Sequence, residues 1–254
     1  MAYKISISNK KGGIGKTTTA VNLADQLMAL GKKVLLVDMD PQRNATTVYG
    51  AQSNNAATVY DIFFADFKAS QCIQTTSFGD IIPNDATLNN ADTMVKIGPT
   101  MYKHIKKALV EIEDKYDYII FDTPPSTGVL LGNALMASDS VIIPVECELF
   151  AVQGLKDMYQ IINEYAEDNE KLNLLGIVII KYKPHQNITK GLENEALPQD
   201  AEKMGTKIFN ARIRESVKCK EAMLTQTRLS QFAPGCTTEV DYKELAKEII
   251  KGRE

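Results

Sequence analysis

A glycine-rich segment near the N-terminus constrains the fold of this chain more than any other feature. The segment spans Lys11 to Thr17 and follows a partly apolar stretch, Tyr3 to Ser8, that has strand character. The residues from Tyr3 to Ser8 alternate apolar and polar side chains, as a strand does. A helix-compatible run, Thr18 to Leu30, comes after the loop and stops at Gly31, a residue type that commonly ends a helix. Strand, glycine loop and helix in this order predict a loop that wraps an anion with its backbone N–H groups.

Phosphate is the anion that such a loop suits. Glycine permits the tight backbone turn, and the following helix adds the partial positive charge of its N-terminus. In a phosphate-binding loop of this kind, Lys16 would reach the β- and γ-phosphates of a nucleotide and the Thr17 hydroxyl would bind Mg²⁺. The residues expected to contact the nucleotide are Lys11, Gly12, Gly13, Ile14, Gly15, Lys16, Thr17 and Thr18.

Acidic residues follow two further apolar stretches. Asp38 and Asp40 come directly after Val34–Val37, and Asp122 ends Tyr118–Phe121. Ligands of open α/β sheets bind outside the carboxyl ends of the strands, so these acids should share a crevice with the glycine loop. We expect Asp122 to hold Mg²⁺ through water, Asp40 to position the attacking water and Asp38 to support the Mg²⁺ shell. A tight turn at Asp40 and a helix cap at Asp122 are the structural alternatives.

The rest of the chain alternates β-branched apolar runs with amphipathic stretches. This pattern predicts an α/β fold with one doubly wound, mostly parallel sheet and helices on both faces. The length of 254 residues favours a single domain over residues 1–254. Further strands are expected at Asp80–Pro83, Ser140–Val145, Leu175–Ile180 and Lys207–Phe209, and helices at Thr58–Phe67, Met101–Lys115 and Tyr242–Lys251.

The net charge of −3 argues against indiscriminate binding of nucleic acid, but one segment is basic. Between residues 203 and 220, six cations stand against one acid, Glu215. Such a run is either a solvated face or a surface that binds phosphates of DNA. The six cations are Lys203, Lys207, Arg212, Arg214, Lys218 and Lys220.

Targeting and metal-binding patterns are missing from the sequence. No signal peptide precedes the first strand, and no apolar run approaches the roughly 18 residues of a membrane span. The four cysteines are widely spaced, and the two histidines have no ligand-like neighbours, so we expect reduced thiols and no protein-bound zinc. These features favour a cytoplasmic protein.

The glycine segment is similar to the deviant Walker A motif, Lys-Gly-Gly-x-Gly-Lys-Ser/Thr, of the ParA/MinD ATPases. Segments 37–46, 116–126, 137–148 and 242–248 also resemble that family, and the similarity runs from about residue 3 to 250. It is greatest to the short ParA proteins of the Soj type, which begin directly at the strand before the loop.

The resemblance implies a P-loop fold and an ATPase that uses Mg²⁺. It implies that Lys11 crosses an ATP-sandwich homodimer to the phosphates of the other subunit, so that Lys11, Lys16 and Asp40 are catalytic. The dimer would bind double-stranded DNA nonspecifically on the nucleoid, without a membrane. A centromere-binding partner of the ParB type would stimulate hydrolysis, and the system would partition plasmids or chromosomes.

Two departures from the family pattern bear on the site. Arg43 stands where many relatives have glycine, beside Asp40. The segment Ile213–Lys218 lacks a proline that many ParA proteins have near the adenine, which leaves the base contacts open. Lys218 falls on the family's arginine that contacts DNA, which favours a DNA surface over a solvated face for the basic segment.

Three other functions remain as alternatives. A MinD-like or cargo-positioning ATPase would act on a membrane or a protein assembly, but a membrane helix should be basic and amphipathic, and the C-terminal helix carries acids as well as cations. A metabolic ligase resembling dethiobiotin synthetase would turn over with a small substrate and without DNA. An iron–sulfur donor like the nitrogenase iron protein would need two positioned cysteines.

Overall fold

Eight strands form one sheet in the computed structural model, which describes residues 1–254 apart from 97, 99, 149–150, 184–190, 192–194 and 254. Their order across the sheet is β3-β4-β2-β5-β1-β6-β7-β8. Neighbouring strands run parallel, except that β3 is antiparallel to β4. The strands are β1 (Tyr3–Ile7), β2 (Val34–Asp38), β3 (Gln74–Thr75), β4 (Asp80–Ile82), β5 (Tyr118–Asp122), β6 (Ser140–Glu146), β7 (Asn173–Tyr182) and β8 (Ile208–Arg214).

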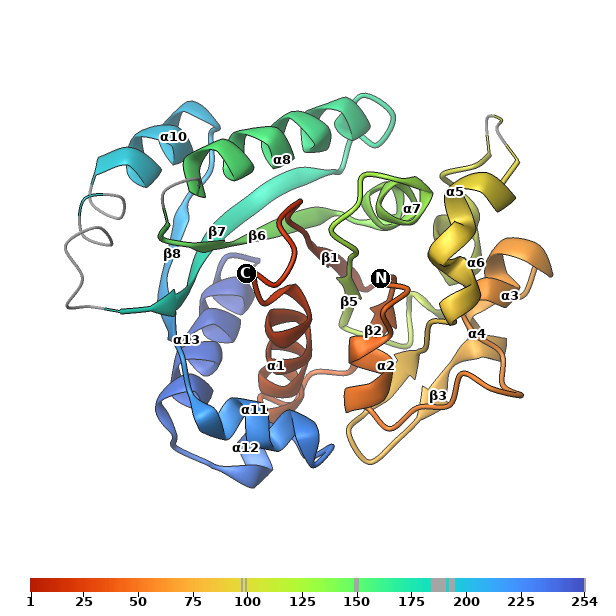
Figure 1. Ribbon diagram of the computed structural model, residues 1–254, viewed down its shortest axis with the longest axis horizontal. Helices are drawn as coiled ribbons and strands as arrows, with labels where there is room; N and C mark the ends of the chain where they lie inside the picture. The colour runs from red at the N-terminus through yellow and green to blue at the C-terminus, as the bar shows by residue number, and fades with distance from the viewer. Residues whose placement is uncertain (97, 99, 149–150, 184–190, 192–194, 254) are drawn as a thin grey trace.

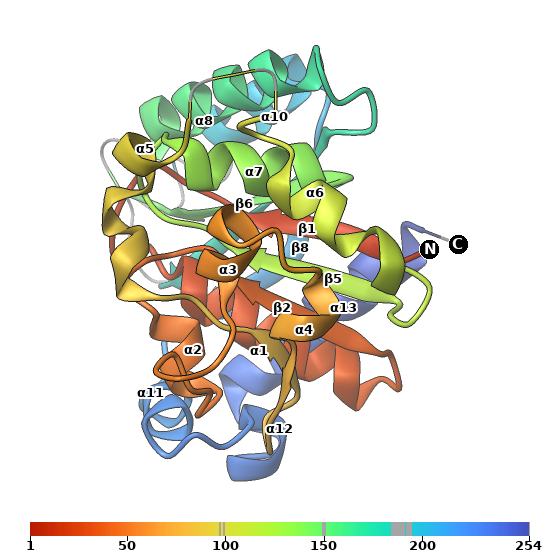
Figure 2. The same cartoon turned by 90° about the vertical axis from the view of Figure 1, so that its right-hand side faces the viewer.

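Helices cover both faces of this sheet (Figures 1 and 2), which confirms the predicted α/β class with a doubly wound, mostly parallel sheet. The helices α1 and α13 lie on one face, and α7 and α8 lie on the other. Among the described helices, none is both long and apolar enough to cross a membrane. The α-helices are α1 (Lys16–Ala29), α2 (Asn44–Val48), α3 (Val59–Phe64), α4 (Ala69–Cys72), α5 (Ala91–Met94), α6 (His104–Leu109), α7 (Val129–Ala137), α8 (Ala151–Ala166), α10 (Leu197–Lys203), α11 (Val217–Leu224), α12 (Leu229–Phe232) and α13 (Thr237–Lys251), with 3-10 turns at η1 (Ala86–Asn90) and η2 (Val110–Ile112).

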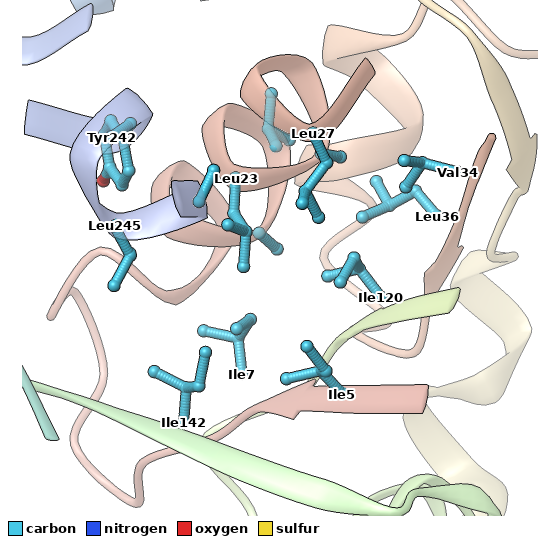
Figure 3. Close-up of a cluster of buried hydrophobic side chains, with 14 of the residues drawn as sticks. Ile5, Ile7, Leu23, Leu27, Val34, Leu36, Ile120, Ile142, Tyr242 and Leu245 are labelled. Carbon is cyan, nitrogen blue, oxygen red and sulfur yellow. The ribbon is translucent and has the colours of Figure 1, made fainter. Parts of the chain in front are cut away.

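Strands β2 and β5 are apolar up to the aspartates that end them, which suits strands covered by helices on both faces. Every residue of β2 and β5 is buried, and the core on the α1 side joins these strands to α1 and α13. In Figure 3, Leu23 and Leu27 of α1 and Leu245 of α13 point toward Ile7 and Ile120 of the sheet. The helix that follows the glycine loop is therefore fixed against the strands that carry the acids.

Some predicted elements have other bounds in the structure. The helix predicted at 101–115 is shorter, because Asn133 of α7 accepts from Ile105 N and donates to Met101 O, so that α6 begins only at His104. The chain then tightens into η2. The helix predicted at 58–67 is limited to α3, where the Thr58 side chain caps the first turn. The strand predicted at 207–209 is longer in the structure, where β8 continues to Arg214. The prediction was too short because this edge strand alternates buried and exposed residues and has no continuous apolar run.

Candidate nucleotide site

The glycine loop adopts backbone conformations that only glycine reaches without strain. Gly13 has φ +69° and Gly15 has φ +80°, both in the left-handed region. Lys16 opens α1 directly after Gly15, and Thr19 N donates to Gly15 O at 2.9 Å. The loop and the first turn of the helix thus take the strand–loop–helix form that a phosphate requires.

Lys16 is held inside the loop that it ends. Its side chain is buried, and its Nζ donates to Lys11 O at 3.0 Å. Burial lowers the pKa of this ammonium, while the carboxylates of Asp122 and Asp40 raise it and compensate only in part. An anion in the loop would stabilise the charged form of Lys16.

Asp122 lies at the centre of the sheet's carboxyl edge. In the sheet register it stands beside both Ile7 of β1 and Asp38 of β2. It is fully buried, and neither carboxylate oxygen has a partner in normal hydrogen-bond geometry among the described residues, although the Thr17 hydroxyl lies close enough to interact with it. Burial and the Asp38 carboxylate raise its pKa well above the usual range, whereas the nearby Thr17 hydroxyl and Lys16 lower it.

A buried carboxylate without a partner in normal hydrogen-bond geometry is costly, so Asp122 fits a site that a further group completes. Mg²⁺ takes oxygen ligands and uses only one or two protein carboxylates together with phosphates and water. The Asp122 oxygens and the Thr17 hydroxyl present such donors beside the phosphate loop. The residues present therefore fit Mg²⁺.

Asp38 and Asp40 differ in how their oxygens are occupied. Asp38 Oδ2 accepts from Thr46 N at 2.8 Å and Thr46 Oγ1 at 2.7 Å, and Oδ1 accepts from Asp40 N at 3.1 Å. Burial raises the pKa of Asp38 to about 6, although these hydrogen bonds lower it. Asp40 Oδ1 accepts from Gln42 N at 2.9 Å, which is the turn expected there. Asp38 thus shapes the loop that presents Asp40.

Two carboxylates at the end of β6 bind lysines beside the loop. Lys11 Nζ donates to Glu148, and Lys181 Nζ lies 2.8 Å from Glu146 Oε2. Lys181 also donates to Gly13 O at 3.3 Å. In this single chain Lys11 is therefore held by an acid of its own subunit. The preceding lysine, Lys10, pairs with a different acid, Asp157 of α8.

A small, mainly apolar cavity of about 100 Å³ adjoins the loop. Residues at the carboxyl ends of β7 and β8, on α11 and α13 and at the start of α1 line it. The segment Ile213–Ser216, which lacks the proline of the family pattern, forms part of its wall. A flat apolar group attached to a phosphate in the loop would lie here. Its other lining residues include Gly15, Thr18, Ile180, Met223 and Tyr242.

The backbone at Arg43 has a conformation that suits the glycine of the family pattern. Its φ is +58°, so the backbone there is left-handed, and glycine reaches that region without a Cβ penalty. Arg43 adopts it while Arg43 N donates to Asp40 O at 2.9 Å and its guanidinium bonds Ser53 at 3.2 Å. The departure keeps the backbone geometry beside Asp40.

The six cations of the basic segment do not form one compact patch. Lys203 and Lys207 precede β8, whereas Lys218 and Lys220 follow it on α11, and β8 is roughly 20 Å long. Figure 1 shows α10 and α11 at opposite ends of β8. Arg212 and Arg214 lie on the strand between them, where Arg212 donates to the Phe209 and Asn210 carbonyls.

Acidic side chains offset part of the charge of this segment, and of these acids only Asp241 lies far along the chain from its partner. Arg214 binds Asp241 of α13 through two donors, Nε at 3.0 Å and Nη2 at 2.6 Å. Lys203, Lys218 and Lys220 keep side chains that are more than half exposed despite their local pairs. The remaining pairs join Lys203 to Asp200 at 3.9 Å, Lys218 to Glu221 at 2.9 Å and Lys220 to Glu215 at 2.7 Å.

Comparisons with known proteins agree on one family. Residues 2–174 match the AAA domain family. The chain is 36% identical over 255 residues to the sporulation initiation inhibitor protein Soj of Bacillus subtilis, with 98% of each chain covered. The chain belongs to the Soj/ParA family of partitioning ATPases.

Solved structures support the same assignment of the fold. A putative plasmid partition protein of Borrelia burgdorferi bound to AMPPNP matches this Soj/ParA chain with a TM-score of 0.80 and 26% identity, over 99% of this chain and 100% of that one. Cobyrinic acid a,c-diamide synthase of Mycobacterium smegmatis, solved with an ATP analogue and magnesium, matches with a TM-score of 0.84 and 26% identity, over 100% and 96%. The predicted P-loop fold is confirmed.

The sequence did not single out several residues that the fold of this Soj/ParA protein brings to the loop. Glu148 contacts Lys11 of the loop, Lys181 contacts its backbone and is itself bound by Glu146, and Tyr242 of α13 lines the cavity beside it. Glu146 and Lys181 stand at the ends of strands whose place beside the loop depends on sheet order. Glu146, Glu148 and Tyr242 lie in segments that resemble the family, whereas Lys181 had no such signal.

Proposed function

We propose that this chain is an ATPase that moves or positions DNA by cycling between an ATP-bound dimer on DNA and a released monomer. The carrying observation is the buried Asp122 carboxylate, which has no partner in normal hydrogen-bond geometry among the described residues and lies beside the phosphate loop and Lys16. Family membership and the nucleotides bound to two structural relatives support the same reading.

The residues of the loop bind and orient the nucleotide in this proposal. The N–H groups from Gly12 to Thr18 surround the phosphates, and Lys16 neutralises them. Thr17 and Asp122 would hold Mg²⁺, Asp122 through water, and Asp38 would support that shell. Mg²⁺ held there would supply positive charge to the β- and γ-phosphates. Asp40 orients the water that attacks the γ-phosphate, from a loop that Asp38 and Thr46 hold in place.

Dimer formation would change the partner of Lys11. In the single chain this lysine bonds Glu148 of its own subunit. In the ATP sandwich it leaves Glu148 and contacts the phosphates bound by the other subunit, where it stabilises the charge of the transition state. ADP lacks the γ-phosphate that stabilises this contact, so hydrolysis favours the monomer.

DNA binding in this proposal belongs to the dimer. One chain offers few phosphate contacts through its basic segment, and two chains offer twice as many. Since the logarithm of affinity falls by about 0.9 per neutralised phosphate for each tenfold rise in salt, doubling the contacts strengthens binding at low salt most. A ParB-type centromere-binding protein would stimulate hydrolysis and release the dimer from the nucleoid.

Replacement of Lys11 tests the proposal. Lys11→Ala should bind Mg-ATP through the loop amides but remain monomeric and inactive, because the contact across the dimer is lost. Lys10→Ala removes a neighbouring lysine whose partner is Asp157, and it should dimerise and hydrolyse normally. Sedimentation equilibrium with Mg-ATP and with Mg-ADP measures both. A Lys11→Ala protein that dimerises with ATP as the wild type does would overturn the cross-subunit role.

A second function has one observation in its favour. The similarity to cobyrinic acid a,c-diamide synthase covers nearly the whole of both chains. A ligase of that kind would use ATP to activate a small carboxylic acid, and its turnover would require that acid and no DNA. Phosphate release measured with random-sequence duplex, and without any small substrate, separates the two, because only the partition ATPase should respond to DNA.

A further inference from the structure

Lys181 contacts the phosphate loop although it lies on β7, far from the loop in the sequence. It lies near the carboxyl end of β7, and its Nζ donates to Gly13 O at 3.3 Å. The same Nζ lies 2.8 Å from Glu146 Oε2 on the neighbouring strand β6. The ammonium therefore bridges the sheet and the backbone of the loop.

The backbone at Lys181 is unusual for a residue with a side chain. Its φ is +49°, in the left-handed region, and the pairing of β7 with β8 shifts register between Ile180 and Tyr182. A bulge of this kind redirects a side chain, and bulges and strained residues are concentrated near functional sites. Lysine is a costly choice at such a position, where glycine or asparagine would adopt the backbone more easily.

A second contact shows that the end of β7 supports the loop directly. A Cβ atom on Gly15 would lie 3.1 Å from Cδ1 of Ile180, the residue before Lys181. Ile180 thus limits the loop at one glycine while Lys181 binds the carbonyl of another, Gly13. In an anion-binding loop the N–H groups turn inward, so a carbonyl that is bonded from outside helps to hold that orientation.

We propose that Lys181 is a positioning residue of the phosphate site. Glu146 anchors its ammonium, the ammonium holds the Gly13 carbonyl against the end of β7, and the loop is thereby preorganised with its amides toward the phosphates. This role rests on the proposed nucleotide function of the loop, and it concerns binding of ATP and ADP alike, because both use the loop amides.

Substitution of Lys181 by asparagine tests the role with little disturbance of the backbone, since asparagine tolerates the left-handed region. Lys181→Asn should weaken binding of Mg-ADP and Mg-ATPγS by about tenfold each, the effect of one hydrogen bond from a charged donor. Lys181→Arg should retain affinity to within about threefold, because it keeps the cation. Lys183→Asn removes an exposed lysine nearby and should change nothing.

Exchange of the ion pair separates a role in loop binding from a role in stability alone. Lys181→Glu combined with Glu146→Lys keeps opposite charges in contact but places a carboxylate against Gly13 O, so affinity should stay low. Lys181→Gly, which also suits the backbone, provides a second variant without the ammonium. Calorimetric titration measures affinity, and the thermal midpoint without nucleotide reports folding.

The outcomes are distinct. Wild-type protein that binds both nucleotides, with the Asn and Gly variants about tenfold weaker and the Arg variant near normal, supports the inference. Asn and Gly variants that bind as the wild type does, or a charge-exchanged pair that recovers full affinity, overturn it and leave the ATPase proposal intact. A wild-type protein that binds neither nucleotide overturns both.

Discussion

The phosphate loop and the basic segment differ in whether the residues that fix their properties are neighbours in the sequence. At the loop, the left-handed conformations of Gly13 and Gly15 follow from one short contiguous motif. In the basic segment, Arg214 is held by Asp241, which stands 27 residues later in the chain. A glycine loop can therefore be predicted from its own sequence, whereas the partner of Arg214 becomes known only from the fold.

The largest effect is expected at Asp40, the acid beside the phosphate loop. Asp40→Ala should lower ATP turnover by about 10²–10⁴-fold, because the water loses the group that orients it, while ATP binding persists. The trapped ATP dimer should also leave DNA slowly. Phosphate release and dissociation from immobilised duplex measure the two effects.

Asp85→Ala is the matched control for that variant. Asp85 accepts a backbone hydrogen bond from Thr87 N at 2.7 Å, much as Asp40 accepts one from Gln42 N at 2.9 Å, but it lies at the start of η1. Its loss should leave turnover unchanged. If both variants lose activity equally, the loss reflects turn stability and Asp40 has no role toward water.

The basic segment offers a test at its two ends. Lys218→Glu with Lys220→Glu should reduce binding to random-sequence DNA by more than tenfold. The slope of log affinity against log salt concentration should become shallower by roughly 3 to 4 for the dimer. Arg214 is left unchanged because Asp241 holds it. Lys203→Glu with Lys207→Glu, at the other end of β8, should have a smaller effect. ATP-driven dimerisation should survive in both variants.

Fluorescence anisotropy across a salt series distinguishes the ends. Equal losses from the two pairs would show that the whole segment contacts DNA, and the difference drawn between α11 and the rest would be wrong. Undiminished affinity and an unchanged salt slope in the α11 pair would remove DNA binding from this helix altogether.

The Arg214–Asp241 pair should matter for stability more than for DNA. Asp241 is buried and accepts from the Arg214 backbone as well as its side chain, so Asp241→Asn should lower the free energy of unfolding by about 1–3 kcal/mol. Glu244→Gln breaks an exposed pair with Lys247 on the same helix and should cost less than about 1 kcal/mol. Urea unfolding compares them, and equal costs would contradict a structural role for Asp241.

Most of the fold and the inner part of the site follow from the sequence. The strands before Asp38 and Asp122 are apolar throughout, so their parallel arrangement and the crevice at their ends could be predicted. The bounds of α6 could not, because Asn133 on another helix sets its start. Periodicity within one segment carries no information about such a partner.

The outer part of the site also depends on sheet order. Lys181 touches the loop only because β7 is two strands from β1 and its end bulges toward the glycines. Glu148 holds Lys11 because β6 adjoins β1. A sequence names the residues at strand ends but does not state which strands are neighbours, so these contacts had to be found in the structure.

The smallest expected effect concerns Arg43, where a local departure from the family leaves the geometry unchanged. A left-handed residue with a Cβ costs about 1 kcal/mol or more, and glycine adds about 0.5–1 kcal/mol of chain entropy to lose on folding. Arg43→Gly should therefore change the free energy of unfolding by less than about 1 kcal/mol, toward stability, despite the lost bond to Ser53. The contact from its backbone N to Asp40 O persists, so ATP turnover should stay near the wild-type rate.

Gln42→Gly, at an adjoining position where φ is not positive, should instead destabilise the protein. Urea unfolding and phosphate release on both variants decide the matter. A large loss of turnover in Arg43→Gly would show that the guanidinium itself serves the site, and that even a locally encoded loop can hide a side-chain role behind a backbone requirement.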